Sequence, residues 1–184
     1  MATRDFDPFR LEVQAFAKEG GQLNGRWPLL QLVRVADSAL EGGGTSRHDT
    51  EVAWSAQGEQ RSAPGGEPQT WLHVKAATAV SLECQRCLQP MAVALAIDRS
   101  FLFVHGEDAA AQLDADSEDD VLALTRSLDL RELVEDELLL ALPIVPRHDV
   151  CPVPLPVRPN DPLAEEKPNP FAALAALKRG GPAN

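Results

Sequence analysis

The sequence predicts an α+β fold, with an antiparallel β-sheet core, flanking helices and a flexible, proline-rich C-terminal tail. Three observations support this prediction. Segments with an apolar residue at every second position follow one another between residues 52 and 103 without helices between them, which favours antiparallel strands. Helical periodicity flanks these segments on both sides. From Pro152 the composition changes to seven prolines in nineteen residues.

The N-terminal part is expected to form two helices. The first is predicted to begin at Asp7 and Pro8, a capping residue followed by a residue favoured in the first turn, and to end at residues 20–21. The second is predicted to begin at Pro28 and to end before the glycines of residues 41–49. The residues expected to share one helix face are Phe9, Val13 and Phe16 in the first, and Leu29, Leu32, Val33, Ala36 and Leu40 in the second.

Strands and turns are expected next. A turn rich in glycine and proline, residues 58–69, separates the first strand from the second. The alternating residues that indicate the strands are Val52, Trp54 and Ala56, then Leu72, Val74, Ala76, Thr78, Val80 and Leu82, then Val93, Leu95, Ile97, Phe101 and Phe103.

Residues 107–120 contain seven acidic residues and are predicted to be a solvated loop or insertion. They do not fit a calcium-binding EF-hand, because Asp119 stands where that loop needs glycine and Thr125 where it needs glutamate. A short strand is expected at residues 121–126.

The clearest helix is expected to begin at Asp129, which with Glu132 forms a capping-box pattern, and to end at Pro143. The carboxylates of Glu132, Glu135 and Asp136 are interpreted as a solvated face that matches the helix dipole.

The net charge of −11 and the isoelectric point near 4.7 argue against general binding to nucleic-acid phosphates. No apolar run has the length of a membrane span, and the N-terminus lacks the apolar centre of a signal peptide, so a cytoplasmic protein with reduced thiols is expected. The triple glycine at residues 42–44 is not followed by the lysine of a phosphate-binding loop. With no other catalytic signature, a conventional enzyme is not expected.

The cysteines are the main candidates for a functional site in this sequence. Cys84 and Cys87 form a C-x-x-C pair, and His148 and Cys151 form an H-x-x-C pair more than sixty residues downstream. Three thiolates and one imidazole would give zinc its usual tetrahedral shell, provided that the segment after Pro143 lies beside the strand that ends near Cys84. Zinc-binding turns favour glycine after the second cysteine, where this chain has Leu88. A redox pair and structural thiols are the alternatives, although no helix is expected to begin at the C-x-x-C pair and lower a thiol pKa.

Three regions are expected: an α+β domain over residues 1–150, a proline-rich linker over residues 151–168, and a tail over residues 169–184. Asn169 and Pro170 are predicted to begin a short helix in the tail. A helix this short is not stable alone, so it is expected to dock on its own domain or on a partner. Its candidate partner-binding residues are Phe171, Leu174, Leu177, Lys178 and Arg179.

Three motifs, CQRCLQP, SLDLRELVEDELLLALPIVPRHDVC and KPNPFAALAALKRG, resemble the bacterial YceD family of large ribosomal RNA subunit accumulation proteins. This resemblance implies a non-enzymatic role in the synthesis, processing or stability of large-subunit ribosomal RNA. The partner would be that RNA or its precursor particles, contacted directly or through basic ribosomal proteins or assembly factors, with no membrane or small-molecule substrate. The family's motif positions correspond here to Cys84, Cys87, Glu135, Asp136, Glu137 and His148. The alternative is a zinc-bound or thiol-based regulatory module without ribosome contact.

Overall fold

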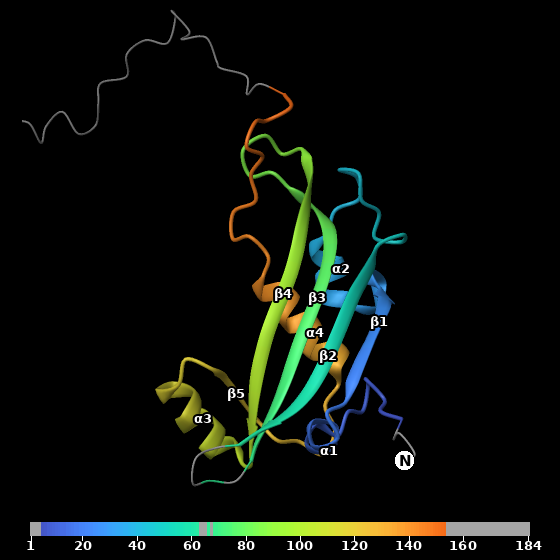
Figure 1. The fold of residues 1–184 in the computed structure, drawn as a ribbon. Helices are drawn as coiled ribbons and strands as arrows, with labels where there is room; N and C mark the ends of the chain where they lie inside the picture. The colour runs from blue at the N-terminus through green and yellow to red at the C-terminus, as the bar shows by residue number, and fades with distance from the viewer. Residues whose placement is uncertain (1–4, 63–65, 67, 154–184) are drawn as a thin grey trace, which may run out of the picture. The chain divides into compact units, whose positions relative to one another are not determined.

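A five-stranded sheet forms the centre of the computed structural model, which describes residues 5–62, 66 and 68–153. The strands are β1 (Gln22–Pro28), β2 (Glu51–Arg61), β3 (Gln69–Glu83), β4 (Pro90–Val104) and β5 (Asp120–Ala123), in that spatial order (Figure 1). Neighbouring strands are antiparallel, except that β5 runs parallel to β4. The predicted α+β fold is therefore confirmed, with one parallel pair that the sequence analysis did not anticipate.

The helices are α1 (Val13–Lys18), α2 (Val33–Ser38), α3 (Glu107–Asp116) and α4 (Leu130–Leu140), with a 3₁₀ turn, η1 (Leu29–Gln31), before α2. Both N-terminal helices are shorter than predicted. The Asp7 carboxylate accepts a hydrogen bond from the Phe9 main-chain N–H (2.9 Å) and forms a turn instead of a helix N-terminus. Leu32 has non-helical backbone angles (φ −99°, ψ 77°), which separate the 3₁₀ turn from α2.

Strand β1 was not predicted from the sequence, which indicated a helix that ends at residues 20–21 and a second helix that begins at Pro28. Solvent exposure alternates only weakly along β1, where Trp27 is the one buried residue. The alternation of buried and exposed side chains that indicates a strand is therefore weak. The strand is nonetheless paired along its whole length, from Gln22 opposite Gln57 to Pro28 opposite Glu51. Pairing with the longer β2 therefore stabilises a strand that its own pattern only weakly indicates.

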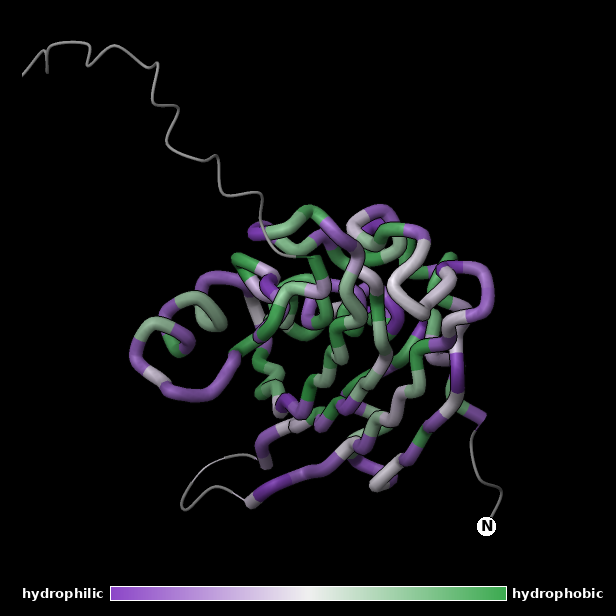
Figure 2. The backbone as a smooth tube through the Cα atoms, turned by 90° about the horizontal axis from the view of Figure 1, so that it is seen from above, coloured by the Kyte–Doolittle hydropathy of each residue, from purple (hydrophilic) through white to green (hydrophobic). Residues whose placement is uncertain are grey.

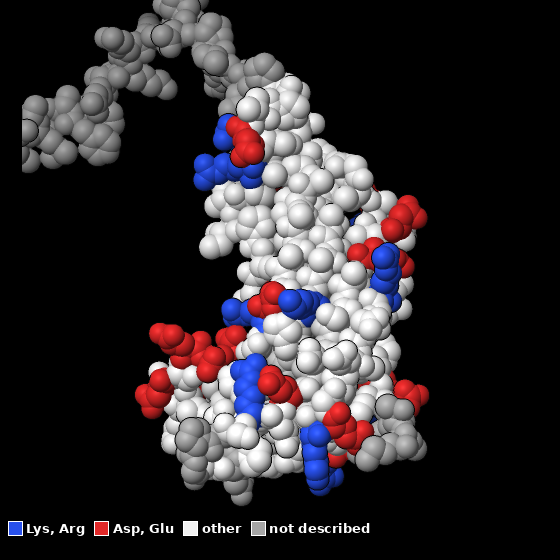
Figure 3. All heavy atoms as spheres, in the orientation of Figure 1, with Lys and Arg blue, Asp and Glu red and all other residues white. Residues whose placement is uncertain are grey.

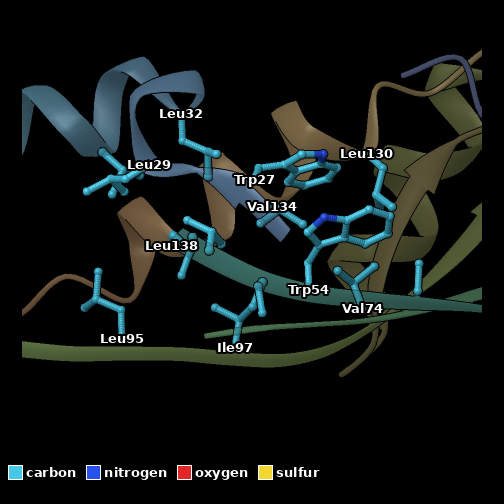
Figure 4. Close-up of a cluster of buried hydrophobic side chains, with 14 of the residues drawn as sticks. Trp27, Leu29, Leu32, Trp54, Val74, Leu95, Ile97, Leu130, Val134 and Leu138 are labelled. Atoms are coloured by element: carbon cyan, nitrogen blue, oxygen red, sulfur yellow. The ribbon is translucent and has the colours of Figure 1, made fainter. Parts of the chain in front are cut away.

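The core lies between the sheet and one layer of helices. Figures 1 and 2 show α1, α2 and α4 on the same face of the sheet. The rings of Trp27 and Trp54 stack with their centroids 4.3 Å apart, next to the α4 side chains (Figure 4). Burying each large apolar side chain contributes about 1.5–3 kcal/mol. Core residues shown in Figure 4 are Trp27, Leu29, Leu32, Trp54, Val74, Leu95, Ile97, Leu130, Val134 and Leu138.

Helix α4 begins as predicted. The Asp129 carboxylate accepts hydrogen bonds from the main-chain N–H groups of Arg131 (2.9 Å) and Glu132 (3.2 Å), which is the geometry of a helix N-cap. Leu130, Val134 and Leu138 form a fully buried stripe on its sheet-facing side. Among the residues that the structure describes, no helix combines the length and apolar character that a bilayer crossing needs.

The acidic segment is largely a helix, so the expected loop is wrong for residues 107–116. Alanine, glutamine and leucine at its centre are strong helix formers, and Glu107 and Asp108 stand in the first turn, where the helix dipole favours negative charge. Only Ala110 of this helix is buried, against the β4–β5 edge of the sheet. The helix connects two parallel strands, which accounts for the parallel pairing of β5.

The N-terminal segment is tied to the start of α4. Leu11 and Leu128 exchange main-chain hydrogen bonds of 2.8 Å in both directions, and the Leu130 N–H donates to the Pro8 carbonyl (2.8 Å). Residues far apart in the sequence thereby form a small antiparallel bridge. This bridge places α1 against the end of the sheet, where a Cβ atom at Gly58 would lie only 2.8 Å from the Ala17 main chain.

Candidate metal centre

The C-x-x-C pair lies in the tight turn between β3 and β4. The Leu88 N–H donates to the Cys84 carbonyl (2.8 Å), and the Cys84 N–H donates to the Gln89 carbonyl (3.0 Å). Leu88 has a φ of 58°, the only positive φ of a non-glycine residue in the described part of the chain. This left-handed conformation costs a side-chain-bearing residue about 1–2 kcal/mol. The turn therefore adopts, with leucine, the backbone conformation for which zinc-binding turns favour glycine.

The H-x-x-C pair lies beside this turn. After α4 the chain runs along the end of the β3–β4 hairpin, as the orange segment of Figure 1 shows. The Pro146 carbonyl accepts a hydrogen bond from the Gln85 N–H (2.8 Å), and the His148 N–H donates to the Cys84 sulfur (3.4 Å). The segment after Pro143 thus meets the end of β3, which was the condition for a shared site.

The four donor atoms of Cys84, Cys87, His148 and Cys151 all lie within 4.8 Å of one another. The Cys87 sulfur is 3.4 Å from Nδ1 of His148. In a tetrahedral zinc site, bonds of about 2.3 Å to sulfur and 2.0 Å to nitrogen place the donors about 3.5–3.8 Å apart. Three thiols and one imidazole at these separations fit zinc, and closure of the shell needs movements of about 1 Å at most.

The hydrogen bonds around Cys84 favour its thiolate form, which is the form that binds metals. Burial by itself would raise the pKa of this thiol, but N–H donors from His148, Cys87 and Arg86 outweigh that effect and lower the pKa to about 5. The opposite holds for Cys151, because burial and the neighbouring sulfurs of Cys87 and Cys84 raise the pKa of its thiol to about 11. A divalent ion would displace the Cys151 proton and compensate the gathered negative charge.

The two alternatives for the cysteines fit this geometry less well. The C-x-x-C turn connects two strands, so it does not stand at the helix N-terminus typical of dithiol oxidoreductases. Structural thiols are usually buried in apolar surroundings, whereas only Cys84 is fully buried here and Cys87 and Cys151 are half-buried. A set of thiols facing one imidazole is typical of a metal site.

The α4 carboxylates do not form one solvated face, so that interpretation is wrong for Glu135. The Glu135 carboxylate is buried and accepts hydrogen bonds from the main-chain N–H groups of Arg34 (2.6 Å) and Val35 (3.4 Å) at the start of α2. It also pairs with the Arg34 guanidinium, and Asp136 pairs with the same guanidinium at 2.6 Å. These two residues therefore connect α4 to α2.

Glu137 connects α4 to the sheet. Its side chain is 11% exposed and lies 3.3 Å from the Arg99 guanidinium, which also pairs with Asp120 of β5 (3.1 Å). Burial raises the pKa of Glu137, and the Arg99 charge offsets part of that rise. No local pattern indicates these links, because the arginine partners lie more than thirty residues away in the chain.

Several basic residues of the described surface are paired with carboxylates. Lys75 pairs with Asp98 (2.9 Å), which also lies 3.1 Å from Nε2 of His73. In Figure 3 most blue side chains lie beside red ones, while the acidic side chains at the lower left gather over α3. The predicted partner-binding residues Phe171, Leu174, Leu177, Lys178 and Arg179 lie outside the described residues, as does most of the predicted linker.

Fold and cluster together define a small α+β protein with a Cys₃His cluster that joins a hairpin turn to the segment after the last described helix. The family model described as "Large ribosomal RNA subunit accumulation protein YceD" matches residues 72–178, more than half of the chain. The chain belongs to the YceD family.

A curated relative supports this assignment. The "Large ribosomal RNA subunit accumulation protein YceD" of Haemophilus influenzae is 41% identical over 105 residues, which cover 54% of this chain and 60% of the relative. The match thus spans less than two thirds of the relative's length. No solved structure matches the chain.

Proposed function

We propose that this protein is a non-enzymatic cytoplasmic factor that supports the accumulation of large-subunit (23S) ribosomal RNA, and thus ribosome biogenesis. The observation that carries the proposal is family membership, together with a relative whose printed name describes that role. The family's motif carboxylates support a non-catalytic role, because Glu135, Asp136 and Glu137 are engaged in ion pairs that join α4 to α2 and to the sheet.

We further propose that the protein acts through basic ribosomal proteins or assembly factors instead of holding the RNA directly. Phosphate binding needs unpaired cations gathered on one surface. Here Lys75 and Arg99 are paired with carboxylates, and α3 has acidic residues in its first turn and no basic residue. An acidic surface of this kind attracts the basic proteins that accompany ribosomal RNA.

The Cys₃His cluster is proposed to hold one zinc ion with a structural role. Zinc would join the β3–β4 turn to residues 146–151, a segment in which the structure describes neither helix nor strand. A metal that joins two segments in this way stabilises the folded form directly. The second candidate function, a zinc-bound or thiol-based regulatory module without ribosome contact, rests on this cluster alone.

The C-terminal region is proposed to consist of a linker over residues 151–168 and a docking tail over residues 169–184. If the tail binds a partner, deletion of residues 169–184 should leave the melting temperature nearly unchanged and abolish the cellular function. A large drop in melting temperature would show instead that the tail contributes to the stability of its own domain.

In-cell crosslinking of the tagged protein tests the proposed function. The RNA and the proteins recovered together are identified, with a cytoplasmic acidic protein of similar size as the control. We expect ribosomal proteins or assembly factors of the large subunit. Crosslinks to large-subunit precursor RNA alone would overturn the protein-mediated route, and recovery of neither class would overturn the ribosomal role and leave the regulatory module. The same conclusion follows if cells that lack the protein accumulate normal large-subunit RNA during slow growth.

A further inference from the structure

The three thiols of the cluster differ in their access to solvent. Cys84 is fully buried, and its sulfur accepts the His148 N–H at 3.4 Å. Cys87 and Cys151 are half-buried, and their sulfurs lie within 4.8 Å of each other. A small oxidant arriving from solvent therefore reaches Cys87 and Cys151 before it reaches Cys84.

We propose that the cluster is a thiol switch, in which a hydroperoxide oxidises Cys87 and Cys151 to a disulfide and releases the zinc ion. This inference rests on the proposed zinc site. It adds a chemical signal to a site that would otherwise be purely structural. It also specifies which pair of sulfurs reacts, which the sequence motif alone would assign to Cys84 and Cys87.

Formation of the disulfide requires the hydroperoxide as its only oxidant. One thiolate attacks the peroxide O–O bond, which forms a sulfenic acid and, after protonation, releases the alcohol or water fragment. The second thiolate attacks the sulfenic sulfur, so that an S–S bond forms and hydroxide leaves as water after protonation. In total two thiolates, one hydroperoxide and two protons give one disulfide, one alcohol (or water) and one water. The two electrons removed from the sulfurs reduce the peroxide bond.

Zinc is released because oxidation removes two of its four ligands. A disulfide is a poor zinc ligand, so Cys84 and His148 would be the only donors left from the four. Two donors do not complete the four-coordinate shell that structural zinc sites use. The ion therefore departs as Zn²⁺, and a thiol reductant with fresh zinc restores the original state.

The identity of the oxidised pair determines what happens to the fold. Cys87 stands in the β3–β4 turn and Cys151 in the segment after α4, so their disulfide joins the same two segments that zinc joins. Oxidation would thus replace a metal cross-link with a covalent one. A disulfide between Cys84 and Cys87 would lie entirely within the turn and would leave the downstream segment without a cross-link.

The test uses the full-length protein, whose zinc content is measured first. Hydrogen peroxide is then added in steps while zinc release is followed with a chromophoric chelator, and peptides are mapped by mass spectrometry before and after reduction. We expect about one zinc released per disulfide formed, a cross-link between Cys87 and Cys151, and recovery of zinc binding after reduction. The variant Cys84→Ser should still form this cross-link, and Cys151→Ser should not.

A cross-link between Cys84 and Cys87, or sulfinic acid without any disulfide, would overturn the inference. The mapping is repeated on metal-free protein, so that the two proposals are judged separately. A protein that neither contains nor takes up zinc refutes the proposed metal site. In that case the disulfide map of the metal-free protein still decides which thiols react.

Discussion

Replacement of Glu135 by alanine tests whether a buried carboxylate on α4 holds α2 in place. The carboxylate accepts the main-chain N–H groups of Arg34 at 2.6 Å and Val35 at 3.4 Å, and these donors have no intrahelical partner because they stand in the first turn of α2. A hydrogen bond to a charged group contributes about 1.5–3 kcal/mol, and the longer bond contributes less. We therefore expect Glu135→Ala to lower the free energy of unfolding by about 3 kcal/mol.

The matched control is Asp136→Ala. Asp136 is the next residue on the same helix and pairs with the same guanidinium at 2.6 Å, but its side chain is 50% exposed whereas that of Glu135 is 11% exposed. Solvent screens an exposed pair, so this control should change the melting temperature by less than about 2 °C. For a chain of this length, the Glu135 variant should melt about 6–12 °C lower than the unaltered protein.

Thermal unfolding followed by circular dichroism measures both variants under the same conditions. Glu135→Gln adds a second comparison, because its amide oxygen can still accept the N–H of Arg34 without carrying charge. It should melt between the alanine variant and the unaltered protein. Equal effects of Glu135→Ala and Asp136→Ala would refute the reasoning, because burial would then not distinguish the two carboxylates.

Three further predictions concern the turn, the metal and a buried acid. Leu88→Gly should raise the free energy of unfolding, measured by denaturant titration, by up to about 1 kcal/mol. Glycine adopts the positive φ of 58° without strain, and the Leu88 side chain is 64% exposed, so little packing is lost. A lower free energy of unfolding would show that the contacts of the Leu88 side chain outweigh the backbone strain. Cys151→Ser should lower the zinc content of the purified protein as much as Cys84→Ser does, and an unchanged content would remove Cys151 from the site. Burial raises the pKa of Glu137 in the folded protein above its ordinary value of 4.5, so the folded state retains the carboxyl proton to a higher pH than the unfolded state does. The stability contributed by this protonated carboxyl is therefore present at low pH and lost as the pH rises. Relative to Glu137→Gln, the unaltered protein should therefore lose stability as the pH rises above about 4.5, and parallel pH profiles of the two proteins would contradict this.

The sequence predicted those parts of the fold that are encoded locally. The strands β2, β3 and β4 and the start of α4 at Asp129 follow from alternation and capping, which depend only on neighbouring residues. The missed strand β1 depends on its pairing with β2, and the missed helix α3 was obscured by its charge. Local patterns do not contain the pairing of β1, because that pairing is set by residues distant in the chain. The helix formers at the centre of α3 were a local signal, but the run of acidic residues was interpreted as a solvated loop.

In the candidate site, too, local patterns could be predicted and contacts between distant residues could not. The spacing of two close pairs indicated which residues could share a metal, but only the fold shows that the turn after β3 meets residues 146–148. The role of Glu135 was misread for a related reason. Its position on the helix suggested a solvated carboxylate, whereas its partner at the start of α2 lies about one hundred residues earlier in the chain.

The bridge between Leu11 and Leu128 has a consequence for the order of events during synthesis. Leu11 leaves the ribosome long before Leu128 is synthesised. The Pro8 carbonyl is likewise made long before the Leu130 N–H that donates to it. At about 5–20 residues per second, the delay is about 6–24 seconds. The β2–β4 meander, whose strands are neighbours in sequence, can pair during that interval. The backbone groups of Pro8 and Leu11 are therefore among the first to be made and among the last to meet their native hydrogen-bond partners.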